Sequence, residues 1–221
     1  NMSLRRSGIL LHPTSFPGKY GIGEIGPHAY DFIDNLADMG QSLWQILPLG
    51  PTDSSHSPYS LLSVFAGNHQ LISFDLLIED ELLDKQCLEN FPNFDNYKVS
   101  FHKVFLERNK IFEIVCSSFN KRGSTIIIQD YQEFCDSNHY WLDDFANFWA
   151  LKQYNPMDAS WPKWVYPDEQ KLERGRSNCK ILQFLFHNQW SRLKKYSSER
   201  GIQIIGDMPI YVGYESADVW K

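Results

Sequence analysis

Residues 8–51 read GILLHPTSFPGKYGIGEIGPHAYDFIDNLADMGQSLWQILPLGP, and this stretch decides the fold. The apolar run over residues 8–11 predicts a short strand, and apolar residues at helical spacing predict an amphipathic helix over residues 27–39. A second apolar run, residues 42–47, predicts another strand that ends before Pro48. Strand, helix and strand in this order make a βαβ unit, whose strands pair in parallel through a right-handed crossover.

The pattern of strands and helices resumes near the end of the sequence. Residues 202–205 form an apolar run that predicts a third parallel strand, buried and leading directly to Asp207. Residues 75–200 carry mostly helical patterns, which we interpret as an inserted helical subdomain. The sequence therefore predicts an α/β fold with three parts: a βαβ unit and a long loop in residues 1–74, the helical subdomain in residues 75–200, and the third strand in residues 201–221.

Composition narrows the classes of function. The chain has 221 residues and a net charge of −6, and its Lys and Arg residues are scattered, which argues against a nucleic-acid partner. No apolar run approaches the roughly 18 residues of a membrane span, so we expect no membrane partner. The four cysteines form no Cys-x-x-Cys pair and the seven histidines no metal-ligand spacing. We therefore expect a cytoplasmic protein with free thiols and neither metal nor cofactor.

Residues 21–26 match the pattern G-x-G-x-x-G of dinucleotide-binding proteins. In those proteins the glycines follow a strand directly, so that the helix N-terminus meets the pyrophosphate. Here residues 13–20 intervene, and the second strand ends without the acidic residue that binds the ribose. We therefore interpret this loop as structural.

The candidate site residues follow the predicted strands. His12 follows the first strand, and its neutral imidazole could donate to a ligand hydroxyl or simply pack. Tyr59, in Ser57-Pro58-Tyr59, lies in the long loop after the second strand. A proline-stiffened tyrosine suits stacking on the apolar face of a sugar ring, although an ordinary loop anchor has the same sequence. Asp207 follows the third strand, where its carboxylate would bind ligand hydroxyls or a neighbouring Arg or His.

A segment rich in aromatic residues and proline, residues 155–167, interrupts the helical patterns. It contains three prolines together with Trp161, Trp164 and Tyr166. These rings would face solvent, a sugar or the core, and the core is the commonest place for aromatic residues.

Several blocks of the sequence together resemble the amylomaltases, the 4-α-glucanotransferases of the α-amylase superfamily. The order and spacing of the blocks match as well as their residues; they are residues 8–15, 20–23, 44–52, 57–59 and 206–212. The resemblance implies a (β/α)8 barrel with inserted helical subdomains that transfers α-1,4-glucan segments between maltooligosaccharides. The family works by a retaining double displacement that requires no cofactor.

The resemblance also assigns roles to residues. Tyr59 would stack under the sugar at the cleavage point and Asp207 would lie beside that sugar. We add Ser57 and His12, from the same sequence blocks, to the expected substrate-binding residues. The nucleophile, the general acid and a third aspartate belong to family motifs downstream of residues 218–220. The resemblance thus implies an N-terminal portion with about three of eight strands, inactive alone and able to self-associate through its open sheet edge.

Two departures from the family pattern accompany these assignments. Residues 53–56 replace a Gly/Tyr-rich stretch, which puts an accessory glucan contact in doubt, and Ser73 stands where relatives often have an aspartate, with Asp75 nearby. Two alternatives remain open: a non-catalytic fragment that binds glucan or another partner through Tyr59 and the aromatic residues of 155–167, and a remnant without function.

Overall fold

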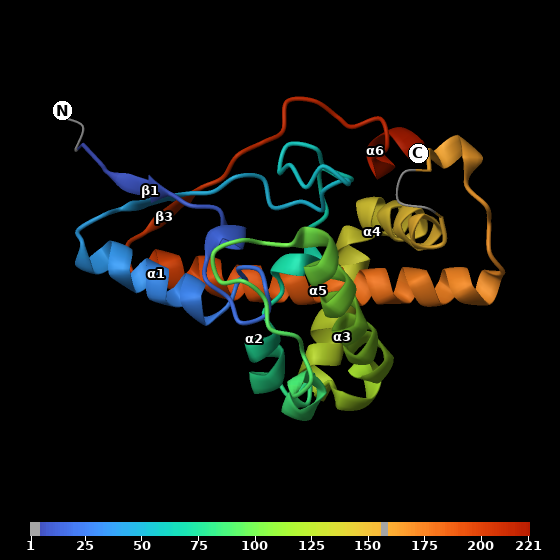
Figure 1. Cartoon of the computed structure of the whole chain (residues 1–221), viewed down its shortest axis with the longest axis horizontal. Helices are drawn as coiled ribbons and strands as arrows, with labels where there is room; N and C mark the ends of the chain where they lie inside the picture. The colour runs from blue at the N-terminus through green and yellow to red at the C-terminus, as the bar shows by residue number, and fades with distance from the viewer. Residues whose placement is uncertain (1–4, 156–158) are drawn as a thin grey trace.

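The computed structural model describes residues 5–155 and 159–221, and its centre is a three-stranded parallel sheet (Figure 1). The strands are β1 (Gly8–Leu10), β2 (Leu43–Gln45) and β3 (Gln203–Ile205), in the order β1-β2-β3. The predicted α/β fold with three parallel strands is confirmed. Each strand is shorter by one to three residues than its apolar run because the ends of the runs leave the ladder.

Helix α1 (Pro27–Asp38) is the crossover between β1 and β2. Proline occupies its first turn, where the missing N–H is no loss, and Gly40 follows its end with a φ of +69°. Ile33 and Leu36 are fully buried, as the spacing predicts. Met39 is 56% exposed because the helix ends one residue earlier than predicted.

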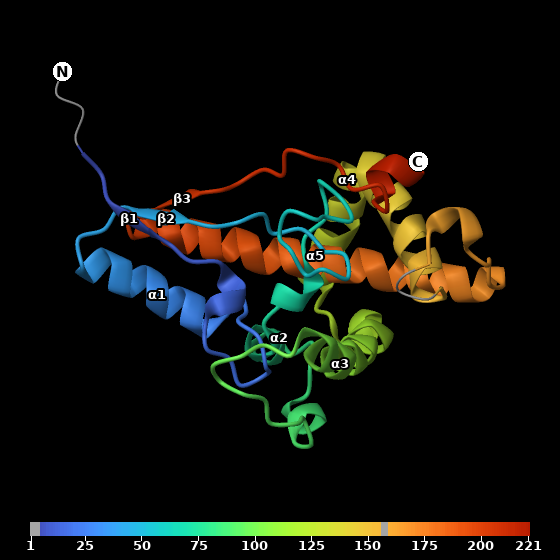
Figure 2. The same ribbon diagram turned by 45° about the horizontal axis from the view of Figure 1, so that its top comes forward.

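The sheet is covered on one face. Both views show α1 and α5 (Glu169–Glu199) running along the same side of the strands (Figures 1 and 2). Trp44, at the centre of β2, is completely buried, whereas Leu10 and Ile205 are 54% and 42% exposed. The prediction of a buried third strand is therefore wrong. Leu10, Gln45 and Ile205 are exposed on the uncovered face, because alternation along a strand leaves every second residue on that face.

The remaining elements are mainly helical. They are η1 (Pro13–Ser15), η2 (His69–Leu71), α2 (Phe74–Glu79), η3 (Lys85–Leu88), α3 (Phe101–Arg122), α4 (Thr125–Gln153), η4 (Trp161–Lys163) and α6 (Ala217–Trp220). One apolar cluster joins Trp44 of the sheet to residues of α1, α3 and α5, while Phe145 and Phe148 belong to a second cluster around α4. The helices thus share the core of the sheet, and the boundaries of a helical subdomain at 75 and 200 stay a prediction.

The loop of residues 21–26 packs closely against its neighbours. A Cβ on Gly23 would overlap the carbonyl oxygen of Pro13, so only glycine fits there. Ser73 caps α2 by accepting a hydrogen bond from the N–H of Leu76. Asp75 instead contacts the preceding loop, where it accepts from the hydroxyl of Tyr20 at 3.0 Å. The serine therefore does the capping that an aspartate can do at this position.

A buried ion pair fastens the same loop to α3. Arg108 Nη1 lies 2.7 Å from Glu24 Oε1, and Nη2 donates to the carbonyl of Ile72 at 2.7 Å. The guanidinium also lies 4.2 Å from the ring centroid of Phe74. Burial raises the pKa of Glu24 and lowers the pKa of Arg108, and each charge opposes the shift of the other. The arginine remains charged, so the pair is a desolvated salt bridge.

Candidate functional site at the strand ends

Tyr59 and Asp207 meet where the strands of the sheet end. The hydroxyl of Tyr59 donates to Asp207 Oδ2 at 2.6 Å, although the two residues lie 148 positions apart in the sequence. Asp207 follows β3 after a single glycine, and Tyr59 is carried by the long loop after β2. The carboxyl ends of parallel strands are where α/β enzymes assemble their sites. The structure thus brings together two of the four predicted site residues.

The loop that carries Tyr59 is fixed by short-range hydrogen bonds. Asp53 Oδ1 accepts from the N–H of Ser55 at 2.8 Å, and Ser55 Oγ accepts from the N–H of Ser57 at 3.2 Å. Ser57 Oγ in turn accepts from the N–H of Tyr59 at 3.3 Å. These side chains replace a regular ladder and hold the loop in successive turns. Ser57 therefore orients the backbone of Tyr59 and is itself half-buried.

The contact leaves the tyrosine ring accessible. Tyr59 is 49% exposed, and the hydrogen bond to the carboxylate of Asp207 is the main cause that raises the pKa of its hydroxyl. The second carboxylate oxygen of Asp207 accepts from the N–H of Met208 at 2.8 Å. A charge-assisted hydrogen bond of this length favours one orientation of the ring. An exposed aromatic face beside a carboxylate can stack on a neutral sugar and accept from its hydroxyls.

His12 lies at the end of β1 on a separately anchored stretch of chain. The indole N–H of Trp44 donates to the carbonyl oxygen of Leu11 at 2.8 Å, which fixes the strand end immediately before His12. Burial lowers the pKa of His12 to about 4, so its imidazole is neutral at physiological pH. Its Nδ1 atom is buried and has no hydrogen-bond partner in the described part of the chain. No hydrogen bond between described residues joins His12 to Tyr59 or Asp207.

A cavity of about 280 Å³ lies beside the loop that carries Tyr59. Its lining is mostly polar and aromatic, including His56, His69 and Trp149, and it carries one acidic and one basic group, Asp53 and Lys152. Burial lowers the pKa of Lys152. His56 stacks on Phe101 with 4.7 Å between ring centroids, in the stretch that departs from the family pattern. The sequence did not predict this cavity because its walls come from a loop, α3 and α4.

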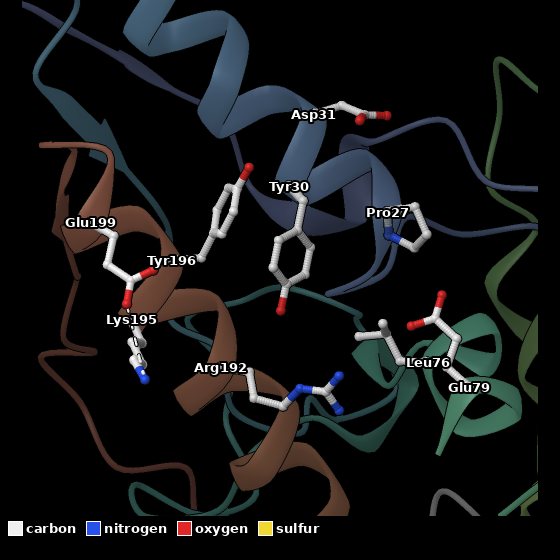
Figure 3. Close-up of a pocket in the computed structure, with 9 residues that line it drawn as sticks. All are labelled: Pro27, Tyr30, Asp31, Leu76, Glu79, Arg192, Lys195, Tyr196 and Glu199. Atoms are coloured by element: carbon white, nitrogen blue, oxygen red, sulfur yellow. Dashed lines mark ion pairs between the residues drawn. The ribbon is translucent and has the colours of Figure 1, made fainter. Parts of the chain in front are cut away.

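A second hollow lies between α1, α2 and α5, and Figure 3 shows the residues that line it. This groove of about 500 Å³ contains acidic and basic groups together, among them Glu79, Arg192 and Lys195. Arg192 is engaged by the carboxylate of Asp80 at 2.7 Å and 3.0 Å. None of the four predicted site residues lines the groove. Arg192 pairs with Asp80 at the end of α2 and Lys195 pairs within α5 with Glu199, so these two basic groups already have structural partners and the strand ends remain the candidate site.

Residues 5–155 and 159–221 contain no group of three or more His, Cys, Asp or Glu side chains arranged to hold a metal ion. Nor does any helix in these ranges have the length and apolar character needed to cross a membrane.

Comparison with known proteins gives the chain its family. The sequence model of the family described as 4-alpha-glucanotransferase matches residues 11–221. The chain belongs to this 4-alpha-glucanotransferase family. The match includes Tyr59 and Asp207, and the resemblance to amylomaltases inferred from the sequence blocks is confirmed.

This chain matches only part of the length of individual family members. The 4-alpha-glucanotransferase of Synechocystis sp. is 40% identical over 227 residues, which cover 98% of this chain and 45% of the relative. The 4-alpha-glucanotransferase of Streptococcus pneumoniae is 38% identical, with 99% of this chain and 45% of the relative covered. The structure of the Streptococcus agalactiae amylomaltase in complex with acarbose matches with a TM-score of 0.90 and 36% identity, over 99% of this chain and 46% of that one. The chain spans about half the length of the relatives it matches.

Proposed function

We propose that the protein carrying this chain is a 4-α-glucanotransferase that transfers α-1,4-glucan segments between maltooligosaccharides. The observation that carries the proposal is the hydrogen bond between Tyr59 and Asp207 at the strand ends, where it joins an exposed ring to a carboxylate. Membership of the family supports the same activity. The sugar would stack on Tyr59, while Asp207 would accept hydrogen bonds from its hydroxyls.

Ser57 and His12 complete the proposed substrate-binding set. Ser57 acts through the backbone of Tyr59, because its hydroxyl accepts from that N–H. His12 offers a neutral imidazole at the neighbouring strand end, which can donate to or accept from a sugar hydroxyl. This division of roles predicts that Ser57 affects the orientation of the ring and that His12 affects the affinity for sugar.

The architecture proposed for the whole protein is a (β/α)8 barrel. β1, β2 and β3 would be three adjacent strands of that barrel, and residues 75–200 would be a helical insertion between the second and third strands. The uncovered face of the present sheet supports this proposal, because a barrel buries that face against side chains from the other strands. The similarity to the amylomaltase structure supports it independently.

The proposed chemistry is a double displacement. A carboxylate attacks the anomeric carbon as the glycosidic C–O bond breaks, and a second carboxyl group gives its proton to the leaving oxygen. The 4-hydroxyl of an acceptor sugar then attacks the covalent glycosyl–enzyme and returns its proton to that group. Retaining chemistry places the two carboxyl groups about 5–5.5 Å apart. We assign Asp207 to substrate binding, and we expect the reacting pair in the part of the relatives' length that this chain does not span.

Disproportionation of maltotriose tests the proposal. The natural gene product that contains this sequence should convert two molecules of maltotriose into glucose and maltopentaose, and Asp207→Asn should lower the rate. The 221-residue chain by itself should give no products. Chromatography of the sugars distinguishes transfer from hydrolysis, because hydrolysis gives glucose and maltose alone. Hydrolysis alone, or no turnover by the gene product, would contradict the proposed transferase.

A second candidate function is a glucan-binding or interaction fragment without catalysis. It is favoured by the same geometry, since the described residues supply a stacking ring and one hydrogen-bonded carboxylate at the strand ends. If the natural gene product binds maltooligosaccharide without turning it over, this non-catalytic function is supported. For either function we propose a cytoplasmic location, which the four free cysteines support.

A further inference from the structure

Trp161 and Tyr214 form an aromatic pair on the surface. Their ring centroids are 5.7 Å apart and their planes are tilted by 32°. Tyr214 is 60% exposed, and Trp161 is only partly buried. Another tryptophan of the same segment, Trp164, is buried in the core. Trp164 therefore belongs to the core, whereas Trp161 packs against the same core cluster and also pairs with Tyr214 at the surface.

The pair is held in place by hydrogen bonds that use both oxygens of one carboxylate. Glu215 Oε1 accepts from the hydroxyl of Ser160 at 2.7 Å, and Glu215 Oε2 accepts from the N–H of Trp161 at 3.3 Å. The indole N–H of Trp161 donates to the carbonyl oxygen of Tyr214 at 3.2 Å. These contacts join two segments that are more than fifty residues apart in sequence. Rings fixed in this way lose little entropy when a ligand stacks on them.

The chain connects this pair directly to the candidate site. Asp207 and Tyr214 belong to the same segment, which leads from β3 to α6 without a helix or strand between them (Figure 1). Tyr214 lies seven positions after Asp207, so their Cα atoms are at most about 25 Å apart even at full extension. A ligand of about that length that extends from Tyr59 along this segment can therefore reach the aromatic pair.

We propose that Trp161 and Tyr214 form a further glucan subsite, which binds sugar units of a long maltooligosaccharide remote from the Tyr59–Asp207 contact. This inference rests on the proposed function and specifies its preferred substrate length. The apolar face of a glucosyl unit packs on aromatic rings without needing a charged partner, and the clamping carboxylate of Glu215 is already engaged. The subsite strengthens the binding of long glucans and leaves the binding of short ones unchanged.

The test compares a short and a long ligand on the 221-residue chain. Dissociation constants for maltotriose and maltoheptaose are measured by NMR titration for the wild type and for Tyr214→Ala. The variant should weaken maltoheptaose binding by about three- to tenfold, the range expected for one aromatic contact, with maltotriose unchanged. Trp161→Ala should have the same selective effect. Tyr166→Ala, a matched control because Tyr166 is 66% exposed on the same segment, should change neither constant.

The outcomes separate the subsite from the proposed function. The subsite is overturned if Tyr214→Ala binds maltoheptaose as tightly as the wild type, or if it loses the same factor in affinity for both sugars. Binding of maltotriose by the wild type would still support the proposed site at Tyr59 and Asp207. A chain that binds neither sugar contradicts both. Thermal melting of each variant establishes that it is folded, and Tyr214→Ala should melt close to the wild type because its ring is mostly exposed.

Discussion

Removal of Arg108 should destabilise the protein severely. Arg108→Met keeps much of the length of the side chain but removes the guanidinium, so the carboxylate of Glu24 loses its partner at 2.7 Å while its side chain stays 9% exposed. The carbonyl of Ile72 loses a donor at the same time. Breaking a buried pair by removing one partner costs about 3–5 kcal/mol. For a chain of this size that loss lowers the Tm by about 6–20 °C.

Thermal and urea unfolding measure this effect, and two further variants isolate its cause. Glu24→Gln combined with Arg108→Met removes both charges, and the double variant should be more stable than Arg108→Met alone by more than about 1 kcal/mol. Arg192→Met breaks an exposed pair with Asp80 and should cost less than about 1 kcal/mol. A Tm for Arg108→Met within about 2 °C of the wild type, or a loss no larger than that of Arg192→Met, would show that the buried pair does not stabilise the fold.

Three other predictions concern the core, the strand end and the sheet edge. Burial lowers the pKa of His69 to about 4, so its contribution to stability is complete above pH 6.5 and is lost as the pH falls toward 4. That loss is on the order of 3 kcal/mol. When the free energy of unfolding is measured in urea at several pH values, it should fall less steeply between pH 6.5 and pH 4 for His69→Gln than for the wild type. Trp44→Phe keeps an apolar ring but removes the donor to Leu11, and it should cost about 1 kcal/mol or more in unfolding experiments; an unchanged stability would mean that the hydrogen bond does not anchor the strand end. The 221-residue chain should self-associate with rising concentration in light scattering, because β1 and β3 are edge strands, and Ile205→Lys should keep it monomeric; a monomeric wild type at all concentrations would contradict this.

The sequence predicted those parts of the fold that depend on local patterns. Apolar periodicity located α1 and the strands of the βαβ unit within a few residues. The predicted burial of β3 was wrong, because burial depends on what covers the second face of the sheet and periodicity carries no information about that cover. The buried pair of Glu24 and Arg108 was also missed, since each residue alone looks like an ordinary surface charge.

The candidate site was predictable only in part. Strand-end positions singled out Asp207 and His12, and the proline before Tyr59 marked a stiff loop. The hydrogen bond between Tyr59 and Asp207 could not be read from spacing, because it joins loops after two different strands. Spacing gave no sign of the pairing of Trp161 with Tyr214 either, because Trp161 lies between α4 and α5 and Tyr214 follows β3. Contacts between distant segments depend on tertiary packing, which a local pattern does not encode.

Maltotriose binding by the 221-residue chain shows whether Tyr59 and Asp207 act together as the sugar-binding contact. NMR titrations of the wild type, Tyr59→Phe, Asp207→Asn and the double variant form a cycle. We predict that each single change weakens binding and that the double variant is only slightly weaker than either, because both singles break the same hydrogen bond. Wild-type affinity in both single variants, or fully additive losses in the double variant, would contradict the account.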